Sequence, residues 1–149
     1  MTVFNLHSEP LKEEWIDAYG HLNEAYYLIP FSNATWALQE ELGIGVSYYE
    51  KTGGALYTVE THLRYLKEVR FPARFEIKSM VFASDTKKLH LGHIMLVDGI
   101  ERATFECLGL HFDSRAAQVA PFPGAALEKF KQIQLPHRPD WINRRISII

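Results

Sequence analysis

The sequence predicts an α+β fold in which an antiparallel sheet wraps around one long helix. Apolar side chains recur at the spacing of a helical face between about residues 24 and 42. From residue 55 onward, apolar and polar side chains alternate, which is typical of strands with one buried face. Asp98-Gly99 is a strong hairpin signal, and a tight hairpin joins antiparallel strands. One long helix followed by an antiparallel meander indicates an α+β architecture.

The expected helix begins at about Glu24 and ends at about Leu42. Asn23 is a suitable N-cap, and Gly43 is a suitable C-terminal stop. Pro30 conflicts with an uninterrupted helix because it removes a backbone hydrogen bond. Either the helix kinks there, or its first turn is separate and Pro30 restarts it. Two apolar stripes make the helix apolar over most of its circumference, as in helices that are buried on several sides. The stripes are Tyr27, Phe31, Ala34, Leu38 and Leu42, and Ala25, Ile29, Ser32 and Trp36.

The other elements follow from the same patterns and from turn residues. An extended lead-in is expected over residues 3–16, and four glycines predict a loop over residues 43–54. A short helix is expected over residues 125–132, before an irregular tail over residues 136–149. The expected strands cover residues 55–69, 73–83, 88–97 and 100–113.

Length and composition exclude several classes of protein. The 149 residues suit a single domain with a real core, which we expect to span residues 1–149. A net charge of −2 gives no sign of nucleic-acid binding, and no apolar run approaches the roughly 20 residues of a membrane span. The N-terminus lacks the pattern of a signal peptide. The single cysteine, Cys107, excludes an internal disulfide and fits the reducing cytoplasm, where we expect the protein to be located.

The segment from Asp17 to Asn23 carries the most suggestive chemistry. It places a carboxylate, a glycine, an imidazole and a side-chain amide within seven residues, directly before the expected helix. The first amides of a helix lack intrahelical partners and lie at its positive end, where a carbonyl oxygen that becomes negative is stabilised. The same residue types are also ordinary turn residues, so a turn and helix cap without chemistry is the alternative.

This segment, Asp-x-x-Gly-His-x-Asn followed by Ala-Tyr-Tyr, resembles the signature of hotdog-fold acyl-CoA thioesterases of the 4-hydroxybenzoyl-CoA thioesterase type. Many members read Asp-x-x-Gly-His-Val-Asn-Asn-x-x-Tyr, and here Leu22 replaces the valine and Glu24 the second asparagine. The resemblance implies the hotdog fold, an antiparallel sheet wrapped around one long central helix. Later segments look like the betainyl-CoA thioesterases of carnitine breakdown, so the likeness covers nearly the whole chain. These segments are residues 60–69, 85–93, 103–106, 110–113 and 120–123.

The resemblance carries the catalytic carboxylate of the 4-hydroxybenzoyl-CoA enzymes onto Asp17. Thioester hydrolysis needs a group that activates water or attacks the carbonyl, and a carboxylate can act as general base or as nucleophile. Amides near residues 23–26, at the start of the helix, can stabilise the developing oxyanion. Asp17 as a turn or cap carboxylate remains the alternative.

Three further catalytic candidates accompany Asp17. Glu68 ends the segment Arg64-Tyr-Leu-Lys-Glu68, which is similar to a Tyr-x-x-Glu segment of plant acyl-ACP thioesterases whose glutamate is a site residue. Otherwise Glu68 is a charged residue at a strand end. His21 either orients Asp17 or the substrate carbonyl, or only satisfies buried backbone groups. Asn23 caps the helix and can also hold a water molecule. Hotdog sites often combine the helix of one subunit with strands of its neighbour, so we expect a homodimer or homotetramer.

Aromatic residues near the motif suggest the substrate. A trimethylammonium group is held well by aromatic faces, so their density predicts selectivity for a quaternary ammonium acyl group. Trp15 and Tyr19 flank Asp17 and are the better candidates for such a cage, whereas Trp36 is expected to be core only. The alternative is that all these rings belong to the core of a small domain. The candidates for substrate binding are Trp15, Tyr19, Tyr26 and Tyr27.

Other side-chain groups carry weaker signals. His90 and His93 lie three residues apart on an expected strand, hence on opposite faces, so they cannot chelate one metal together. Glu60 and His62 share a face and form either a site pair or a surface contact. Cys107 is expected to pack in the core. We expect no metal site. Candidates for binding the phosphates of coenzyme A are Lys67, Arg70, Lys87, Lys88 and Arg115.

The sequence therefore predicts an acyl-CoA thioesterase that hydrolyses a short acyl-CoA, with betainyl-CoA as the expected substrate and betaine and CoA as products. No bound cofactor is expected. The alternative is a non-catalytic hotdog module that binds acyl-CoA or acyl carrier protein. Hotdog hydratases and dehydratases carry a differently spaced Asp and His around an Asn-Pro, which this sequence lacks. A Rossmann oxidoreductase or serine hydrolase has no support, because the sequence contains no Gly-rich phosphate loop and no Gly-x-Ser-x-Gly elbow.

Overall fold

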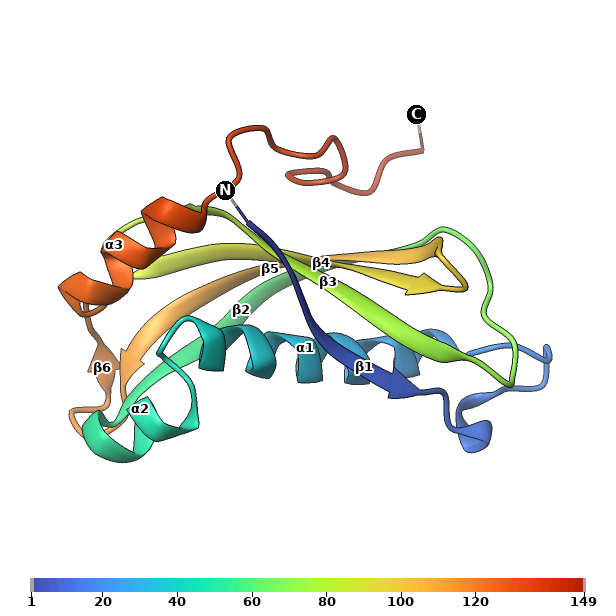
Figure 1. The fold of residues 1–149 in the computed structure, drawn as a ribbon, viewed down its shortest axis with the longest axis horizontal. Coiled ribbons are helices and arrows are strands. Elements are labelled where there is room, and N and C mark those ends of the chain that lie inside the picture. The colour runs from blue at the N-terminus through green and yellow to red at the C-terminus, as the bar shows by residue number, and fades with distance from the viewer. Residues whose placement is uncertain (1, 149) are drawn as a thin grey trace.

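The computed structural model describes residues 2–148, and Figure 1 shows how their elements are arranged. The strands are β1 (Val3–Pro10), β2 (Gly54–Tyr65), β3 (Arg74–Ser84), β4 (Lys88–Val97), β5 (Ile100–Asp113) and β6 (Gln118–Val119). The helices are α1 (Leu28–Glu41), α2 (Val46–Thr52) and α3 (Gly124–Ile133), and the short 3-10 helices η1 (Glu13–Trp15) and η2 (Glu24–Tyr27) precede α1. None of the helices within residues 2–148 has the length and apolar character needed to span a membrane.

All strands belong to one antiparallel sheet, which curves over α1 (Figure 1). Its order is β1-β3-β4-β5-β2, with β6 beside β5. Strands β3, β4 and β5 form the expected meander, and Asp98-Gly99 joins β4 to β5 with positive φ at both residues. The prediction that β2 belongs to this meander, beside β3, was wrong. β2 pairs with β5 instead and forms the edge of the sheet opposite β1. Residues 66–73 connect β2 to β3, a length that allows the chain to cross the sheet rather than turn tightly.

The start of the long helix resolves the conflict that Pro30 poses. The first turn is a separate 3-10 helix, η2, and α1 begins at Leu28, so Pro30 lies in the first turn of α1. A proline is tolerated in that turn because its missing N–H has no intrahelical partner there. Gly43 follows the C-cap residue of α1, Leu42, and has φ +76°, as expected of a C-terminal stop.

The predicted apolar stripes of the helix have different fates. The first stripe is buried against the inner face of the sheet, as expected. The prediction that the second stripe is buried was wrong, because Ile29 and Trp36 are exposed, Trp36 by 51%. One curved sheet covers only one side of a helix, so the other side of α1 remains open in a single chain.

The region between α1 and β2 is not the loop that its glycines suggested. Residues 46–52 form helix α2, and the Glu40 carboxylate accepts a hydrogen bond from the Val46 amide at 2.6 Å. This carboxylate comes from the end of α1, six residues upstream of the amide that it caps. Gly53 ends α2 with φ +77°, so two of the four glycines flank a helix instead of forming a loop.

A buried polar group lies between helix and sheet. His93 on β4 is fully buried, and its ring nitrogens lie 2.8 Å from Thr35 Oγ1 on α1 and 2.8 Å from Ser79 Oγ on β3. Burial lowers the pKa of His93 to about 3, so the imidazole is neutral. His90 lies on the opposite face, 2.7 Å from a carboxylate oxygen of Glu106, as the spacing predicted.

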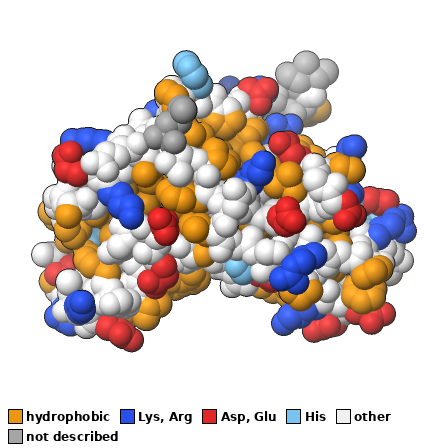
Figure 2. Space-filling model, in the orientation of Figure 1, with side chains coloured by type: hydrophobic (Ala, Val, Ile, Leu, Met, Phe, Trp, Pro, Cys, Tyr) orange, Lys and Arg blue, Asp and Glu red, His pale blue; other side chains and the backbone are white. Residues whose placement is uncertain are grey.

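The outer face of the sheet is partly covered by the C-terminal segment, which crosses above it in Figure 1. Ile142 packs with Met80 and Phe82, and Ile94 and Trp141 pack against this cluster. The apolar outer positions of β4 are therefore partly covered by the chain itself. On the face seen in Figure 2, acidic and basic side chains are interspersed, which agrees with the small net charge.

Candidate active site

The segment from Asp17 to Asn23 forms a closed turn directly before η2. The turn is fixed by backbone hydrogen bonds from the Asp17 amide to His21 O at 3.1 Å and from the Gly20 amide to Asp17 O at 2.9 Å. Gly20 has φ +81°, a backbone conformation that glycine adopts without strain. The turn brings the side chains of Asp17 and Asn23 together, although six residues separate them.

Both carboxylate oxygens of Asp17 accept a hydrogen bond. Asn23 Nδ2 donates to Oδ2 at 3.0 Å, and the Tyr19 amide donates to Oδ1 at 2.9 Å. These two bonds, the Asn23 bond first, lower the pKa of Asp17 below its ordinary value of 3.8. Asp17 is therefore ionised at neutral pH and held in one orientation.

Asn23 has two simultaneous functions in the turn. Its side-chain oxygen accepts from the Ala25 amide at 3.0 Å, which confirms it as an N-cap, although of η2 rather than of an α-helix. The Asn23 and Tyr26 amides also have acceptors, Trp15 O at 3.0 Å and Asn23 O at 3.1 Å. Within residues 2–148, the Glu24 amide is left as the helix-start donor without a hydrogen-bond acceptor.

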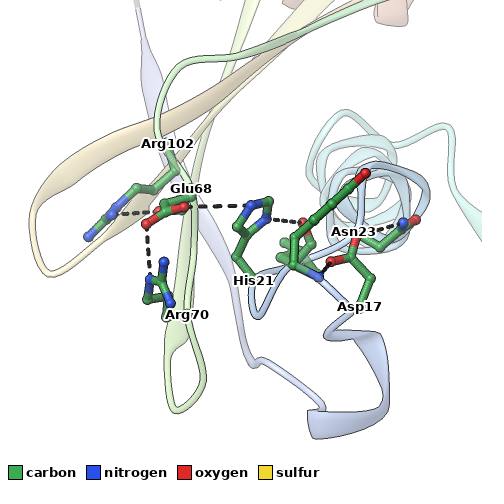
Figure 3. A network of polar contacts seen from close by, with 8 residues as sticks. Asp17, His21, Asn23, Glu68, Arg70 and Arg102 are labelled. Carbon is green, nitrogen blue, oxygen red and sulfur yellow. Dashed lines mark hydrogen bonds and ion pairs between the residues drawn. The ribbon is translucent and has the colours of Figure 1, made fainter.

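Glu68 lies beside His21, although it is distant in sequence. Its carboxylate is 3.6 Å from His21 Nε2 and 2.9 Å from Arg70 Nε, and Figure 3 shows Glu68 between these two groups. His21 Nδ1 is 3.5 Å from Leu22 O. The structure thus brings all four catalytic candidates to one place: Asp17, His21, Asn23 and Glu68.

These four residues line a cavity of about 450 Å³ at the start of η2. Two of the four predicted substrate-binding residues, Tyr19 and Tyr27, line it as well. Trp15 does not line the cavity, and its ring stacks on Tyr26 with ring centroids 5.7 Å apart. Tyr26 is likewise absent from the lining.

Tyr65 and Glu24 are lining residues that the sequence reasoning did not single out. The Tyr65 ring meets the Tyr27 ring edge-to-face at 4.9 Å, and its hydroxyl donates to Glu24 O at 3.1 Å. Tyr65 stands three residues before Glu68, at the tyrosine of the Tyr-x-x-Glu segment, and that was the signal that could have identified it.

The charges that line the cavity are mostly negative. Asp17, Glu24 and Glu68 contribute carboxylates, whereas Lys67 is the only lysine or arginine among the lining residues that the structure describes. Arg70, another candidate for binding the phosphates of coenzyme A, forms an ion pair with Glu68. The other candidates are elsewhere: Lys88 pairs with Asp85, and Arg115 donates to Glu50 O at 3.1 Å. Because Arg70 pairs with Glu68, Asp17 and Glu24 are the lining carboxylates without an ion pair to a lysine or arginine within residues 2–148, and they favour a cationic ligand group.

The other side chains that the sequence singled out lie outside this cavity. Glu60 and His62 line a second cavity, of about 320 Å³, on the outer face of the sheet. Cys107 is buried in the core, as expected, and burial raises the pKa of its thiol. Across residues 2–148, no group of three or more histidine, cysteine, aspartate or glutamate side chains could hold a metal ion.

Comparisons with known proteins identify relatives of this chain. The model of the thioesterase-like superfamily matches residues 12–130. A betainyl-CoA thioesterase of Pseudomonas aeruginosa is 33% identical, with 98% of this chain and 96% of that protein covered. An L-carnitine dehydrogenase/betainyl-CoA thioesterase of Agrobacterium fabrum is 37% identical over 82% of this chain, but the match spans only 25% of that longer protein.

Solved structures show the same fold. A hypothetical protein of Staphylococcus aureus in complex with CoA superposes with a TM-score of 0.87 at 22% identity, covering 100% of this chain and 98% of the other. A protein of Pseudomonas putida gives a TM-score of 0.83 at 28% identity, covering 100% and 99%. The chain therefore belongs to the thioesterase-like superfamily and is a thioester hydrolase with the hotdog fold, as the sequence predicted.

Proposed function

We propose that the protein hydrolyses betainyl-CoA to betaine and CoA, with Asp17 as the catalytic carboxylate. The observation that carries this proposal is the acidic, tyrosine-lined cavity that holds Asp17 at the start of η2. The betainyl-CoA thioesterase relative supports the choice of acyl group. Coenzyme A enters as part of the substrate, no bound cofactor is needed, and we place the reaction in the cytoplasm.

The chemistry follows from the positions of Asp17 and Glu24. Asp17 either takes a proton from the water that attacks the thioester carbonyl, or attacks the carbonyl itself to form an anhydride that water then hydrolyses. In both routes the carbonyl oxygen becomes negative and the CoA thiolate leaves. The Glu24 amide, which has no acceptor within residues 2–148, is the donor best placed to stabilise this oxyanion.

The trimethylammonium group of a betainyl substrate needs aromatic faces and negative charge. Tyr27 and Tyr65 supply adjoining rings, Tyr19 supplies a third, and Glu24 adds a carboxylate. Each aromatic face contributes roughly 0.5–2 kcal/mol to binding a cation, depending on desolvation. The proposed cage therefore keeps Tyr19 and Tyr27 of the original candidates and replaces Trp15 and Tyr26 by Tyr65.

We also propose that the active unit is a homodimer joined through β2. This strand is an open edge of the sheet and carries exposed apolar side chains, including Val59, which is 54% exposed. Ile29 and Trp36 on α1 are exposed as well. A long, apolar edge strand readily pairs with another strand, and a second copy offers a matching one. The outer face, partly covered by the C-terminal segment, is a weaker interface.

The substrate proposal is tested by comparing betainyl-CoA with 3,3-dimethylbutyryl-CoA, which has the same shape but no charge. Purified protein is assayed for release of free thiol from both, within a panel of acyl-CoAs. We expect kcat/KM to favour betainyl-CoA by about 10- to 1000-fold. Equal values would contradict the cation site and leave thioester hydrolysis standing. Binding of acyl-CoA without any thiol release would favour the non-catalytic module instead.

Variants of Tyr65 test which residues form the cage. Tyr65→Leu should lower the preference for betainyl-CoA by about 10-fold, whereas Tyr65→Phe should largely keep it, because the ring remains. Tyr49→Leu is the matched control, since Tyr49 is an exposed tyrosine on α2, away from the cavity and from β2. An unchanged preference in Tyr65→Leu would remove Tyr65 from the cage.

A further inference from the structure

The carboxylate of Glu68 is carried by a connection, not by a strand. Residues 66–73 join β2 to β3, so no sheet pairing of its own strand fixes the Glu68 backbone. A side chain must be held within about 0.5 Å of its working geometry to act in a site. The neighbouring structure therefore has to supply that constraint.

Arg102, at the start of β5, makes three hydrogen bonds to this connection. Its carbonyl accepts hydrogen bonds from the Leu66 amide at 2.9 Å and the Lys67 amide at 3.2 Å. Its guanidinium Nη1 donates to the carbonyl of Glu68 at 2.8 Å, the contact drawn in Figure 3. The adjoining Val69 carbonyl accepts from the Leu22 amide at 2.8 Å, so the same connection is bonded directly to the catalytic turn.

The guanidinium of Arg102 joins two separate segments. Nη2 donates to Val97 O at 3.4 Å, at the end of β4, while Nη1 holds Glu68 O. Nε is buried and has no partner within residues 2–148, and none of the ion pairs recorded there involves Arg102. A planar fork can reach two carbonyls at once, whereas the single nitrogen of a lysine cannot keep this geometry.

We propose that Arg102 is a positioning residue that sets the Glu68 carboxylate against His21. The inference rests on the proposed function, in which Asp17 is the catalytic carboxylate, and adds to it a part in catalysis for Glu68 beside His21. Arg102 itself does not line the cavity of Asp17, so it influences the reaction through the connection. Arg102 holds the backbone of Glu68 through its carbonyl, while Arg70 and His21 contact the carboxylate of the same residue.

A double-mutant cycle separates this function from a merely structural one. Arg102→Lys keeps the charge and loses the fork, so kcat should fall by about 10- to 100-fold, the cost of a small misplacement of a catalytic group, with little change in KM. Glu68→Gln should lower kcat as well. In the Glu68→Gln background, Arg102→Lys should change kcat by less than about twofold, because the group that it positions is already disabled. Losses that multiply would overturn the proposal, as would a Glu68→Gln variant with wild-type kcat.

Arg144→Lys is the matched control, because Arg144 also donates to a backbone carbonyl, that of Asp140, but lies in the C-terminal segment. It should leave kcat unchanged. The thermal midpoint is recorded for every variant, and if Arg102→Lys does not fold, Arg102→Gln is tested by the same criteria. A loss of kcat in Arg144→Lys equal to that in Arg102→Lys would also overturn the proposal.

A second readout needs no turnover. The ring-proton NMR resonance of His21, assigned with a His21→Gln variant, should move in Arg102→Lys in the same direction as in Glu68→Gln. It should stay in place in Arg144→Lys. A resonance unmoved by Arg102→Lys would overturn the positioning role. Absence of thioesterase activity in the wild type, with the resonance moving as expected, would instead count against the proposed function alone.

Discussion

Asn23 donates a hydrogen bond from Nδ2 to Asp17 Oδ2 at 3.0 Å while its side-chain oxygen accepts from the Ala25 amide at 3.0 Å. One side chain therefore starts the helix and orients the carboxylate. The side-chain nitrogen of Asn23 can only donate and its side-chain oxygen can only accept. Only one orientation of the side-chain amide therefore satisfies both partners. The position of Asp17 is thus coupled to the first turn, whose Glu24 amide is the proposed oxyanion donor.

Asn23→Asp separates these two functions. Aspartate caps a helix about as well as asparagine, so the thermal midpoint should stay close to that of the wild type. The new carboxylate cannot donate to Asp17 and repels it, so the pKa of Asp17 should rise. Activity that needs ionised Asp17 should then be lost at a higher pH than in the wild type. The measurement is kcat against pH for both proteins, and superimposable profiles would show that the Asn23 bond does not control Asp17.

Asp17→Asn should abolish turnover without disturbing the fold. Asparagine keeps the shape of aspartate but cannot act as base or nucleophile, and losing a general base costs on the order of 10²- to 10⁴-fold in kcat. Circular dichroism and the thermal midpoint check that the fold is intact. If the variant retains more than about a tenth of the wild-type kcat, Asp17 is only a turn carboxylate, and Glu68 becomes the catalytic candidate.

The local parts of the site could be predicted from the sequence. Asp17, His21 and Asn23 lie within one turn, and the turn is closed by bonds among its own residues. The cap at Asn23 and the stop at Gly43 are likewise set by residues next to the helix ends. Such features depend on few neighbours, so spacing and residue type are enough to find them.

The parts that depend on distant contacts could not be predicted. Tyr65 reaches the cavity because β2 pairs with β5 at the sheet edge, and the sequence suggested a meander in which β2 would lie beside β3. Helix α2 depends on the carboxylate of Glu40, which lies on another helix. Trp36 has helical spacing like a core residue, but the sheet covers only the other side of α1. Sequence periodicity shows which face of a helix or strand a residue lies on, but it does not show which other element packs against that face.

The buried His93 should make the protein less stable in mild acid. Its pKa is lowered from 6.5 to about 3 in the folded protein, so below pH 6.5 the unfolded chain binds a proton that the folded chain does not. The contribution of neutral His93 is complete above the unfolded pKa and is lost as pH falls from 6.5 towards 3. Between about pH 8 and pH 5 the free energy of unfolding should fall by about 2 kcal/mol from this group.

Urea unfolding at the two pH values measures this dependence. His93→Gln, which can still bond with Thr35 and Ser79, should show a smaller fall between the two pH values. His90→Gln is the control, because His90 is only partly buried and lies beside the Glu106 carboxylate on the outer face. If the fall is the same in His93→Gln as in the wild type, His93 is not its source.

The open edge at β2 predicts that Val59→Lys will weaken self-association. A lysine on an edge strand disfavours pairing with another strand, because its charge would have to be buried in the new interface. Val3→Lys is the matched control, since Val3 is 44% exposed on β1, the opposite edge of the same sheet. Light scattering at micromolar concentration should give at least a dimer for the wild type and for Val3→Lys, and a shift towards monomer for Val59→Lys. Activity should fall together with the dimer if strands of one subunit complete the site of the other. A stable wild-type monomer would contradict both the dimer and a shared site, whereas loss of the dimer in Val3→Lys alone would move the interface to β1.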